Sequence, residues 1–99
     1  MIQVIYHWTV APDKFLQFQK VWKSTTNYIH QNVEGALGSR MIRSIENPSE
    51  VRTIAKWRSI HDWSAFWEGE NPKEMSEMRL IGHRSSVEVF EEVEDQTYS

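Results

Sequence analysis

Residues 2–10 of the chain alternate between apolar and mixed positions. One parity is apolar throughout, and the other consists of polar residues and one isoleucine. Because successive side chains of a strand point to opposite faces, this alternation predicts a strand with one strongly apolar face. The apolar parity comprises Ile2, Val4, Tyr6, Trp8 and Val10, and the mixed parity comprises Gln3, Ile5, His7 and Thr9.

The spacing changes between Ala11 and Gly35, where apolar residues recur at steps of three and four. This spacing is typical of one face of an amphipathic helix. Pro12 suits the first turn of the helix and Gly35 its end. The predicted inner stripe consists of Phe15, Phe18, Trp22, Thr25, Ile29 and Val33.

Two strand patterns follow, roughly at residues 38–46 and 51–58, and the turn-forming run Asn47-Pro48-Ser49 joins them. We expect a hairpin at this point. The second strand should place one parity on each face and end near Trp57. Its two parities are Val51, Thr53, Ala55 and Trp57, and Arg52, Ile54, Lys56 and Arg58.

The last part of the chain alternates between helical and strand patterns. Ser59 and Asp62 resemble a capping box that opens a short helix, and Gly69 can end this helix. A second helical stretch begins after Pro72 and runs to Gly82. A final strand is expected at residues 84–94, followed by an acidic tail at residues 95–99 that we expect to be frayed.

The predicted order is β-α-β-β-α-β, with the second helix broken in two. It indicates an α+β fold of the ferredoxin-like type, with an antiparallel four-stranded sheet in one domain at residues 1–94. Helices cover only one face of such a sheet. The other face should mix apolar and polar residues, which predicts a symmetric homodimer whose sheets pack face to face. Its apolar members are Ile5, Ile42, Ile54 and Phe90, interleaved with Gln3, His7 and Arg52.

Composition narrows the possible functions. The chain has 99 residues, a net charge of -3 and no cysteine. The negative charge and scattered basic residues argue against a nucleic-acid partner, and the lack of cysteine excludes disulfides and thiolate metal sites. The N-terminus lacks the pattern of a signal peptide, and no apolar run reaches the ~20 residues of a membrane span. We therefore expect a cytoplasmic protein with no membrane partner.

The chain resembles the antibiotic biosynthesis monooxygenase family of dimeric α+β barrels. The resemblance rests on a first strand leading to a P-x-K helix start, on the turn and hairpin VEGALGSRMIRSIENPSE, and on the strand-Trp-Ser-helix signature VRTIAKWRSIHDWSAF. It implies a dimer with a pocket in each subunit, between the helices and the sheet. Known activities of the family include oxygenation of aromatic polyketides without metal or flavin, quinol oxidation and haem degradation.

The aromatic cluster after the third strand is the main candidate for a binding site. Helical spacing places Trp63, Phe66 and Trp67 on one face, which should look toward the sheet. Tyr6 and Trp8 stand opposite on the apolar parity of the first strand. Such rings, with Tyr28 or Trp22 from the long helix and Met75 and Met78 as walls, would suit a flat aromatic ligand. The alternative is that all these residues, like Trp57, only fill the core.

Four histidines are candidates for the base that oxygenation without a cofactor requires. His83, near the entry to the last strand, is the best of them. His7 should face the dimer interior, whereas His30 and His61 should be exposed to solvent. None has metal-ligand spacing with another residue, and we predict no bound metal.

The leading hypothesis is a cofactor-independent monooxygenase acting on a small aromatic or quinol-like substrate. Tyr6 or His83 would accept a proton or orient a hydroxyl, and Trp67 with Trp63 would stack on the ring. Trp8, Phe66 and Met78 would exclude water. One alternative is a dimer that binds a small ligand without chemistry.

A second alternative is a haem-degrading monooxygenase, in which haem would be the substrate. The residues of that branch are only partly matched. Tyr6 stands where the branch has Asn, Phe66 where it has Trp, and Met75 to Met78 where it has His. Haem degradation is therefore the less favoured activity.

Overall fold

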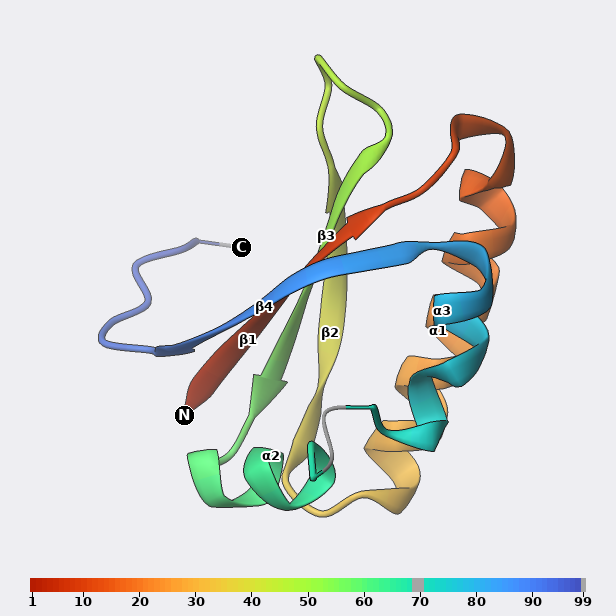
Figure 1. The fold of residues 1–99 in the computed structure, drawn as a ribbon. Coiled ribbons are helices and arrows are strands. Elements are labelled where there is room, and N and C mark those ends of the chain that lie inside the picture. The colour runs from red at the N-terminus through yellow and green to blue at the C-terminus, as the bar shows by residue number, and fades with distance from the viewer. Residues whose placement is uncertain (69–70, 99) are drawn as a thin grey trace.

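The computed structural model describes residues 1–68 and 71–98 (Figure 1). The predicted order of strands and helices is confirmed, including the break in the second helical region. The elements are β1 (Ile2–Thr9), the 3-10 turn Pro12–Lys14, α1 (Phe15–Asn32), β2 (Ala36–Arg43), β3 (Glu50–Trp57), α2 (Ile60–Phe66), the 3-10 turn Lys73–Met75, α3 (Ser76–Ile81) and β4 (His83–Glu91).

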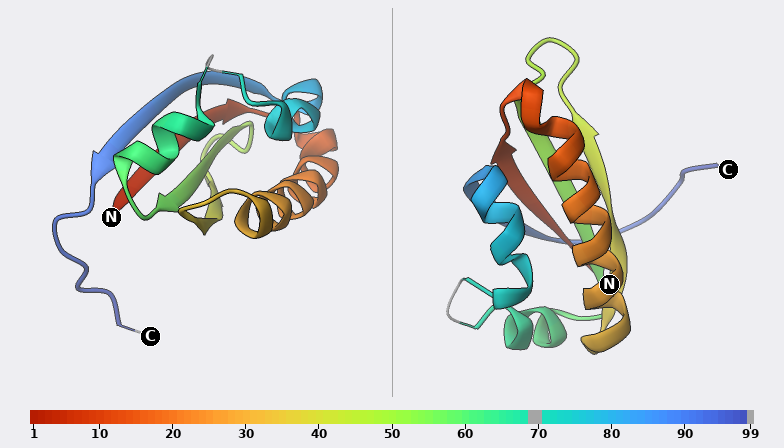
Figure 2. Two further views of the ribbon diagram at one scale, coloured as in Figure 1. Left: turned by 90° about the horizontal axis from the view of Figure 1, so that it is seen from below. Right: turned by 90° about the vertical axis from the view of Figure 1, so that its right-hand side faces the viewer.

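The four strands form one sheet in the order β2-β3-β1-β4, and each neighbouring pair is antiparallel. The predicted ferredoxin-like topology is therefore confirmed. Helices α1 and α3 lie side by side on one face of the sheet, and α2 crosses near one end of it (Figures 1 and 2). The opposite face carries no helix among the described residues.

Some predicted boundaries are wrong. Strand β2 begins at Ala36, before the predicted start, because an irregularity between Ala36 and Ser39 lets Ala36 pair with Trp57. Gly38 adopts a positive φ of 107° within this irregularity, which glycine tolerates without steric cost. The hairpin loop begins at Ser44, whose hydroxyl accepts a hydrogen bond from the Asn47 amide.

The other boundary errors are at the end of the chain. Strand β4 ends at Glu91, before the predicted end, and the described residues after it form neither helix nor strand. The predicted helix end at Gly69 lies outside the described residues.

The core lies between the sheet and α1, on the apolar parity of β1. The buried members of that parity are Ile2, Val4, Tyr6, Trp8 and Val10, as predicted. The Trp8 and Phe18 rings meet edge to face, with centroids 5.1 Å apart. The Trp8 indole Nε1 donates to Thr53 Oγ1 over 3.0 Å, so its polar atom is satisfied despite full burial.

A polar corner fixes the position of α2. Ser59 caps the helix, and its hydroxyl accepts from the Asp62 amide at 3.2 Å, as the capping pattern predicts. Arg58 bonds both Asp62 and Glu34, at 3.0 and 3.1 Å. Gly35 has a φ of 87°, and a Cβ there would lie 2.5 Å from the Asp62 side chain. Only glycine fits this turn, which ties α2 to the junction of α1 and β2.

The uncovered face of the sheet has the predicted mixed composition. The register pairs Ile5 with Ile54 and His7 with Arg52 across β1 and β3. Ile42 is 52% exposed and Phe90 is 49% exposed at the flanks of this central pair. We call this surface the open face.

Candidate functional site

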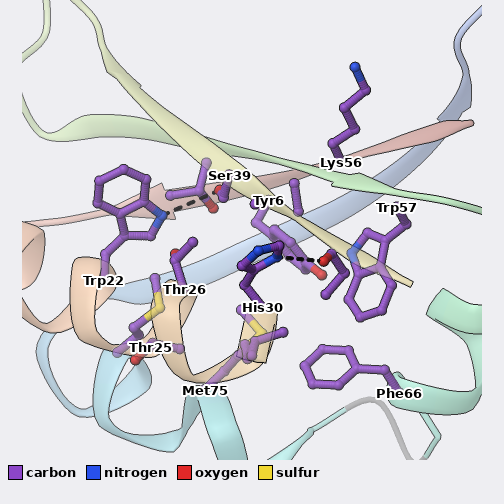
Figure 3. Close-up of a pocket in the computed structure, with 16 residues that line it drawn as sticks. Tyr6, Trp22, Thr25, Thr26, His30, Ser39, Lys56, Trp57, Phe66 and Met75 are labelled. Atoms are coloured by element: carbon purple, nitrogen blue, oxygen red, sulfur yellow. Dashed lines mark hydrogen bonds between the residues drawn. The ribbon is translucent and has the colours of Figure 1, made fainter. Parts of the chain in front are cut away.

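A cavity lies between α1, the helix-facing side of the sheet, α2 and the 3-10 turn that precedes α3 (Figure 3). The cavity volume is about 40 Å³, and the empty space among the lining atoms is about 450 Å³ when the open mouth is included. A cavity this narrow holds a few waters at most, so a flat ring enters only if a wall side chain moves.

Aromatic rings form two opposite walls of the cavity. Trp57 and Phe66 stand together on one side, with ring centroids 5.1 Å apart. Trp22 from α1 stands on the other side, and its Nε1 donates to Ser39 Oγ on β2 over 3.3 Å. Few polar groups lie beside Trp57 and Phe66. This part of the cavity therefore suits a flat apolar ring.

Tyr6 lies at the inner end of the cavity, on β1. Its hydroxyl oxygen accepts a hydrogen bond from Trp63 Nε1 over 3.1 Å. Burial raises the pKa of the Tyr6 phenol to about 12, although the bond from Trp63 acts in the opposite direction. The phenol therefore stays protonated at neutral pH. It can donate its O–H to a bound oxygen atom, whereas accepting a proton is unfavourable.

Trp63 and Trp67 stack on each other behind Tyr6, with centroids 5.4 Å apart and an interplanar angle of 18°. The Trp67 ring also contacts Tyr6 at 5.4 Å, and the Arg84 guanidinium lies 4.7 Å above Trp67. The predicted orientation of this helix toward the sheet is confirmed. However, neither indole lines the cavity; each packs on the far side of Tyr6.

The other predicted site residues divide into two groups. Phe66, Met75 and Met78 line the cavity with Tyr6, and the two methionines are 4% and 1% exposed. Trp8, Tyr28 and His83 are not among the residues that line it. Trp8 is fully buried, Tyr28 is 53% exposed on α1, and His83 is exposed at the start of β4.

Sequence reasoning missed Thr26 and His30 of α1 as cavity residues, whereas it named Trp22 as an alternative to Tyr28. Trp22, Thr26 and His30 line the cavity together. They follow one another at steps of four, so the helical pattern already placed them on one face. His30 is exposed as predicted, but its ring also reaches the cavity and its Nδ1 lies 2.8 Å from the Ala36 carbonyl oxygen.

His7 lies on the open face as predicted, and its Nε2 is 2.5 Å from Glu88 Oε1. Within residues 1–68 and 71–98, no group of three or more His, Asp and Glu side chains is arranged to hold a metal ion. In the same part of the chain, every helix is too short or too polar to cross a membrane.

A family model described as antibiotic biosynthesis monooxygenase matches residues 1–77, from β1 into α3. The chain belongs to this family. The antibiotic biosynthesis monooxygenase resemblance drawn from the hairpin and the strand-Trp-Ser-helix signature is thereby confirmed. No curated protein matches the chain significantly.

Several solved structures have a similar fold. SnoaB, a cofactor-independent oxygenase from Streptomyces nogalater, is 15% identical with a TM-score of 0.73, covering 98% of this chain and 97% of SnoaB. A conserved protein from Methanosarcina mazei Go1 is 18% identical with a TM-score of 0.70, covering 90% and 89% of the two chains. Rv0793 from Mycobacterium tuberculosis is 13% identical with a TM-score of 0.67, covering 97% and 98%. Identities this low show a shared fold only.

Proposed function

We propose that this chain is a cofactor-independent monooxygenase that acts on a small aromatic or quinol-like molecule. The observation that carries the proposal is a cavity with aromatic walls and a buried, protonated tyrosine at its inner end. Family membership and the description of SnoaB as a cofactor-independent oxygenase support the same reading.

The cavity residues would hold the ring and control its oxygen substituent. Trp57 and Phe66 would lie against the ring plane, and Tyr6 would donate its O–H to a carbonyl or hydroxyl oxygen of the substrate. Met75 and Met78 would keep water from the reacting carbon. The earlier candidates His83 and Trp67 lie away from this cavity, and their catalytic roles stay predictions.

A monooxygenation of this kind needs no external reductant. When a ring methylene becomes a carbonyl, two C–H bonds break and one atom of O₂ forms the new C=O bond. The other oxygen atom leaves as water with the two hydrogens. The substrate supplies all the electrons, so the protein has only to bind the ring, stabilise negative charge on its oxygen and exclude water.

Oxygen uptake by the purified protein tests the proposal, with a panel of dihydroxynaphthalenes and anthrones as substrates. We expect uptake above buffer with at least one compound, reduced about tenfold or more in Tyr6→Phe because the donor is lost. Tyr28→Phe, which changes an exposed tyrosine outside the cavity, is the matched control. Uptake equal to buffer across the panel would contradict the proposal.

A binding protein without chemistry is the second candidate, and the largely apolar lining of the cavity favours it. Quenching of tryptophan fluorescence by quinones without oxygen uptake would support this function. We do not propose haem degradation, because Tyr6, Phe66 and the stretch Met75 to Met78 stand where the haem-degrading branch has Asn, Trp and His.

We also propose that two copies pack through their open faces, as the sequence predicts. The neighbouring Ile5 and Ile54, with Ile42 and Phe90 partly exposed beside them, give that face an apolar centre. Sedimentation at micromolar concentration should show a dimer. A purely monomeric species would contradict the proposal. The cytoplasmic location stays a prediction.

A further inference from the structure

His30 lies at the mouth of the cavity, in the last turn of α1, with one ring nitrogen bonded to the backbone. Its Nδ1 is 2.8 Å from the carbonyl oxygen of Ala36. A carbonyl oxygen can only accept a hydrogen bond, so Nδ1 must carry the hydrogen. In the neutral imidazole the other nitrogen, Nε2, then carries a free lone pair.

The backbone carbonyl that sets this tautomer is held firmly. Ala36 is 7% exposed and begins β2, directly after the positive-φ Gly35. The Arg58 amide donates to the Gly35 carbonyl over 2.8 Å, and the Val33 amide donates to the Ile29 carbonyl over 2.9 Å. These hydrogen bonds hold the turn between α1 and β2, and with it the Ala36 carbonyl that accepts from His30.

The His30 ring lies between the two aromatic walls, with Trp22 on one side and Trp57 and Phe66 on the other (Figure 3). Within residues 1–68 and 71–98, its Nε2 makes no hydrogen bond. The Lys56 ammonium points away from the cavity. An imidazole nitrogen is thus available to a ligand that lies between the walls.

The remaining polar groups of the cavity are weaker acceptors for a proton. Ser39 Oγ already accepts from Trp22, and Thr53 Oγ1 accepts from Trp8. Tyr6 is a neutral phenol, and Thr25 and Thr26 contribute hydroxyls. Imidazole is the side chain suited to take a proton near neutral pH, so His30 is the base that this cavity offers.

We propose that His30 Nε2 accepts the proton of a hydroxyl on the bound aromatic ring, so that the site selects hydroxylated aromatics over plain ones. In this step the ring O–H bond breaks and an Nε2–H bond forms, leaving a phenolate beside an imidazolium; nothing is oxidised. The inference rests on the proposed function insofar as it places the ligand in the same cavity, and it names the ligand class.

Equilibrium dialysis with 2-naphthol and naphthalene tests this selectivity, since the two probes differ by one hydroxyl. We expect wild type to bind 2-naphthol about tenfold more tightly, as a hydrogen bond between ligand and protein of this kind would give. His30→Asn should abolish the preference, because the Asn amide can still donate to Ala36 but offers no basic nitrogen. His61→Asn, at an exposed helix position outside the cavity, is the matched control and should keep the preference.

NMR of the imidazole nitrogens in wild type gives a second test that requires no variant to fold. We expect the tautomer with hydrogen on Nδ1 and a shift of the Nε2 resonance when 2-naphthol is added. Hydrogen on Nε2 in the neutral ring, or an Nε2 resonance that 2-naphthol does not move, would overturn the proposal. Equal binding of the two probes by wild type would do the same.

The outcomes for His30 and for the proposed function are separable. In one outcome, His30→Asn loses the preference for 2-naphthol while no panel compound causes oxygen uptake. That result would support the role of His30 and contradict the monooxygenase function. Alternatively, wild type takes up oxygen, and His30→Asn equals wild type in both oxygen uptake and binding of the two probes. That result would support the monooxygenase function and overturn the role of His30.

Discussion

The two faces of the sheet are built from the same four strands but have opposite character. On the helix-facing side the apolar side chains are buried, and the buried indole nitrogens of Trp8 and Trp63 each have a partner oxygen. On the open face, Ile5 and Ile54 pair at the centre among charged and polar residues. Side-chain alternation along each strand produces this division.

The difference shows where chemistry and association can each occur. Several polar side chains of the helix-facing side are already engaged, so the chemistry of the cavity depends on those that remain, among them Tyr6 O–H and His30 Nε2. On the open face, the apolar centre suits packing against a second copy.

The largest effect should come from breaking the helix-facing core. Trp8→Ala removes a fully buried ring and leaves Thr53 without its indole partner, so we expect a loss of about 4 kcal/mol in the free energy of unfolding. Urea unfolding measures it. On the open face, Ile42→Ala should lower the free energy of unfolding by less than about 1 kcal/mol. Equal losses at Trp8 and Ile42 would contradict the difference in burial between the two faces.

The pKa of Tyr6 predicts a stability change at high pH. Below the ordinary tyrosine value of 10.0, the folded and unfolded states both keep the proton. Between 10.0 and about 12, the unfolded state loses the proton and the folded state retains it, so stability falls as pH rises. A difference of about two pKa units corresponds to about 3 kcal/mol.

Urea unfolding of wild type and Tyr6→Phe across that range isolates the effect from other titrating groups. At neutral pH, Tyr6→Phe should be less stable by about 1–3 kcal/mol because the Trp63 N–H loses its acceptor. As the pH approaches about 12, the difference in free energy of unfolding between the two proteins should change by about 3 kcal/mol in favour of Tyr6→Phe. Tyr28→Phe should follow wild type throughout, and a constant gap for Tyr6→Phe would refute the assignment.

A charge at the centre of the open face should weaken dimer formation. Ile54→Lys places an ammonium across from Arg40 and between Arg52 and Lys56, so we expect the dimer Kd to rise about tenfold or more, or about 1.4 kcal/mol. Sedimentation over a concentration series measures it. Leu80→Lys, on an exposed helix position, should leave the Kd unchanged. An unchanged Kd for Ile54→Lys would mean that copies associate elsewhere.

The smallest effect concerns the corner that holds α2 over the cavity. Ser59→Ala removes the helix cap and should lower the free energy of unfolding by about 1 kcal/mol. Thermal unfolding followed by circular dichroism measures the change. Ser64→Ala, within the same helix but exposed, should cause no loss. A loss of equal size in both variants would rule out the cap as the cause.

The sequence by itself determined the strand faces, the inner stripe of α1, the cap at Ser59 and the family. These features depend on local spacing, which the backbone geometry of strands and helices converts directly into position. It also placed Tyr6, Phe66, Met75 and Met78 on elements that face the core, and these four line the cavity.

Only the tertiary structure decided which rings face the cavity and which pack behind it. Trp63 and Trp67 share their helix face with Phe66, yet they stack on the far side of Tyr6, because the polar corner of Gly35, Arg58 and Asp62 sets the position of α2. The tautomer of His30 likewise depends on a carbonyl six residues away that a turn brings back to α1. Spacing fixes the direction of a side chain from its own element, whereas its partners depend on how distant elements pack.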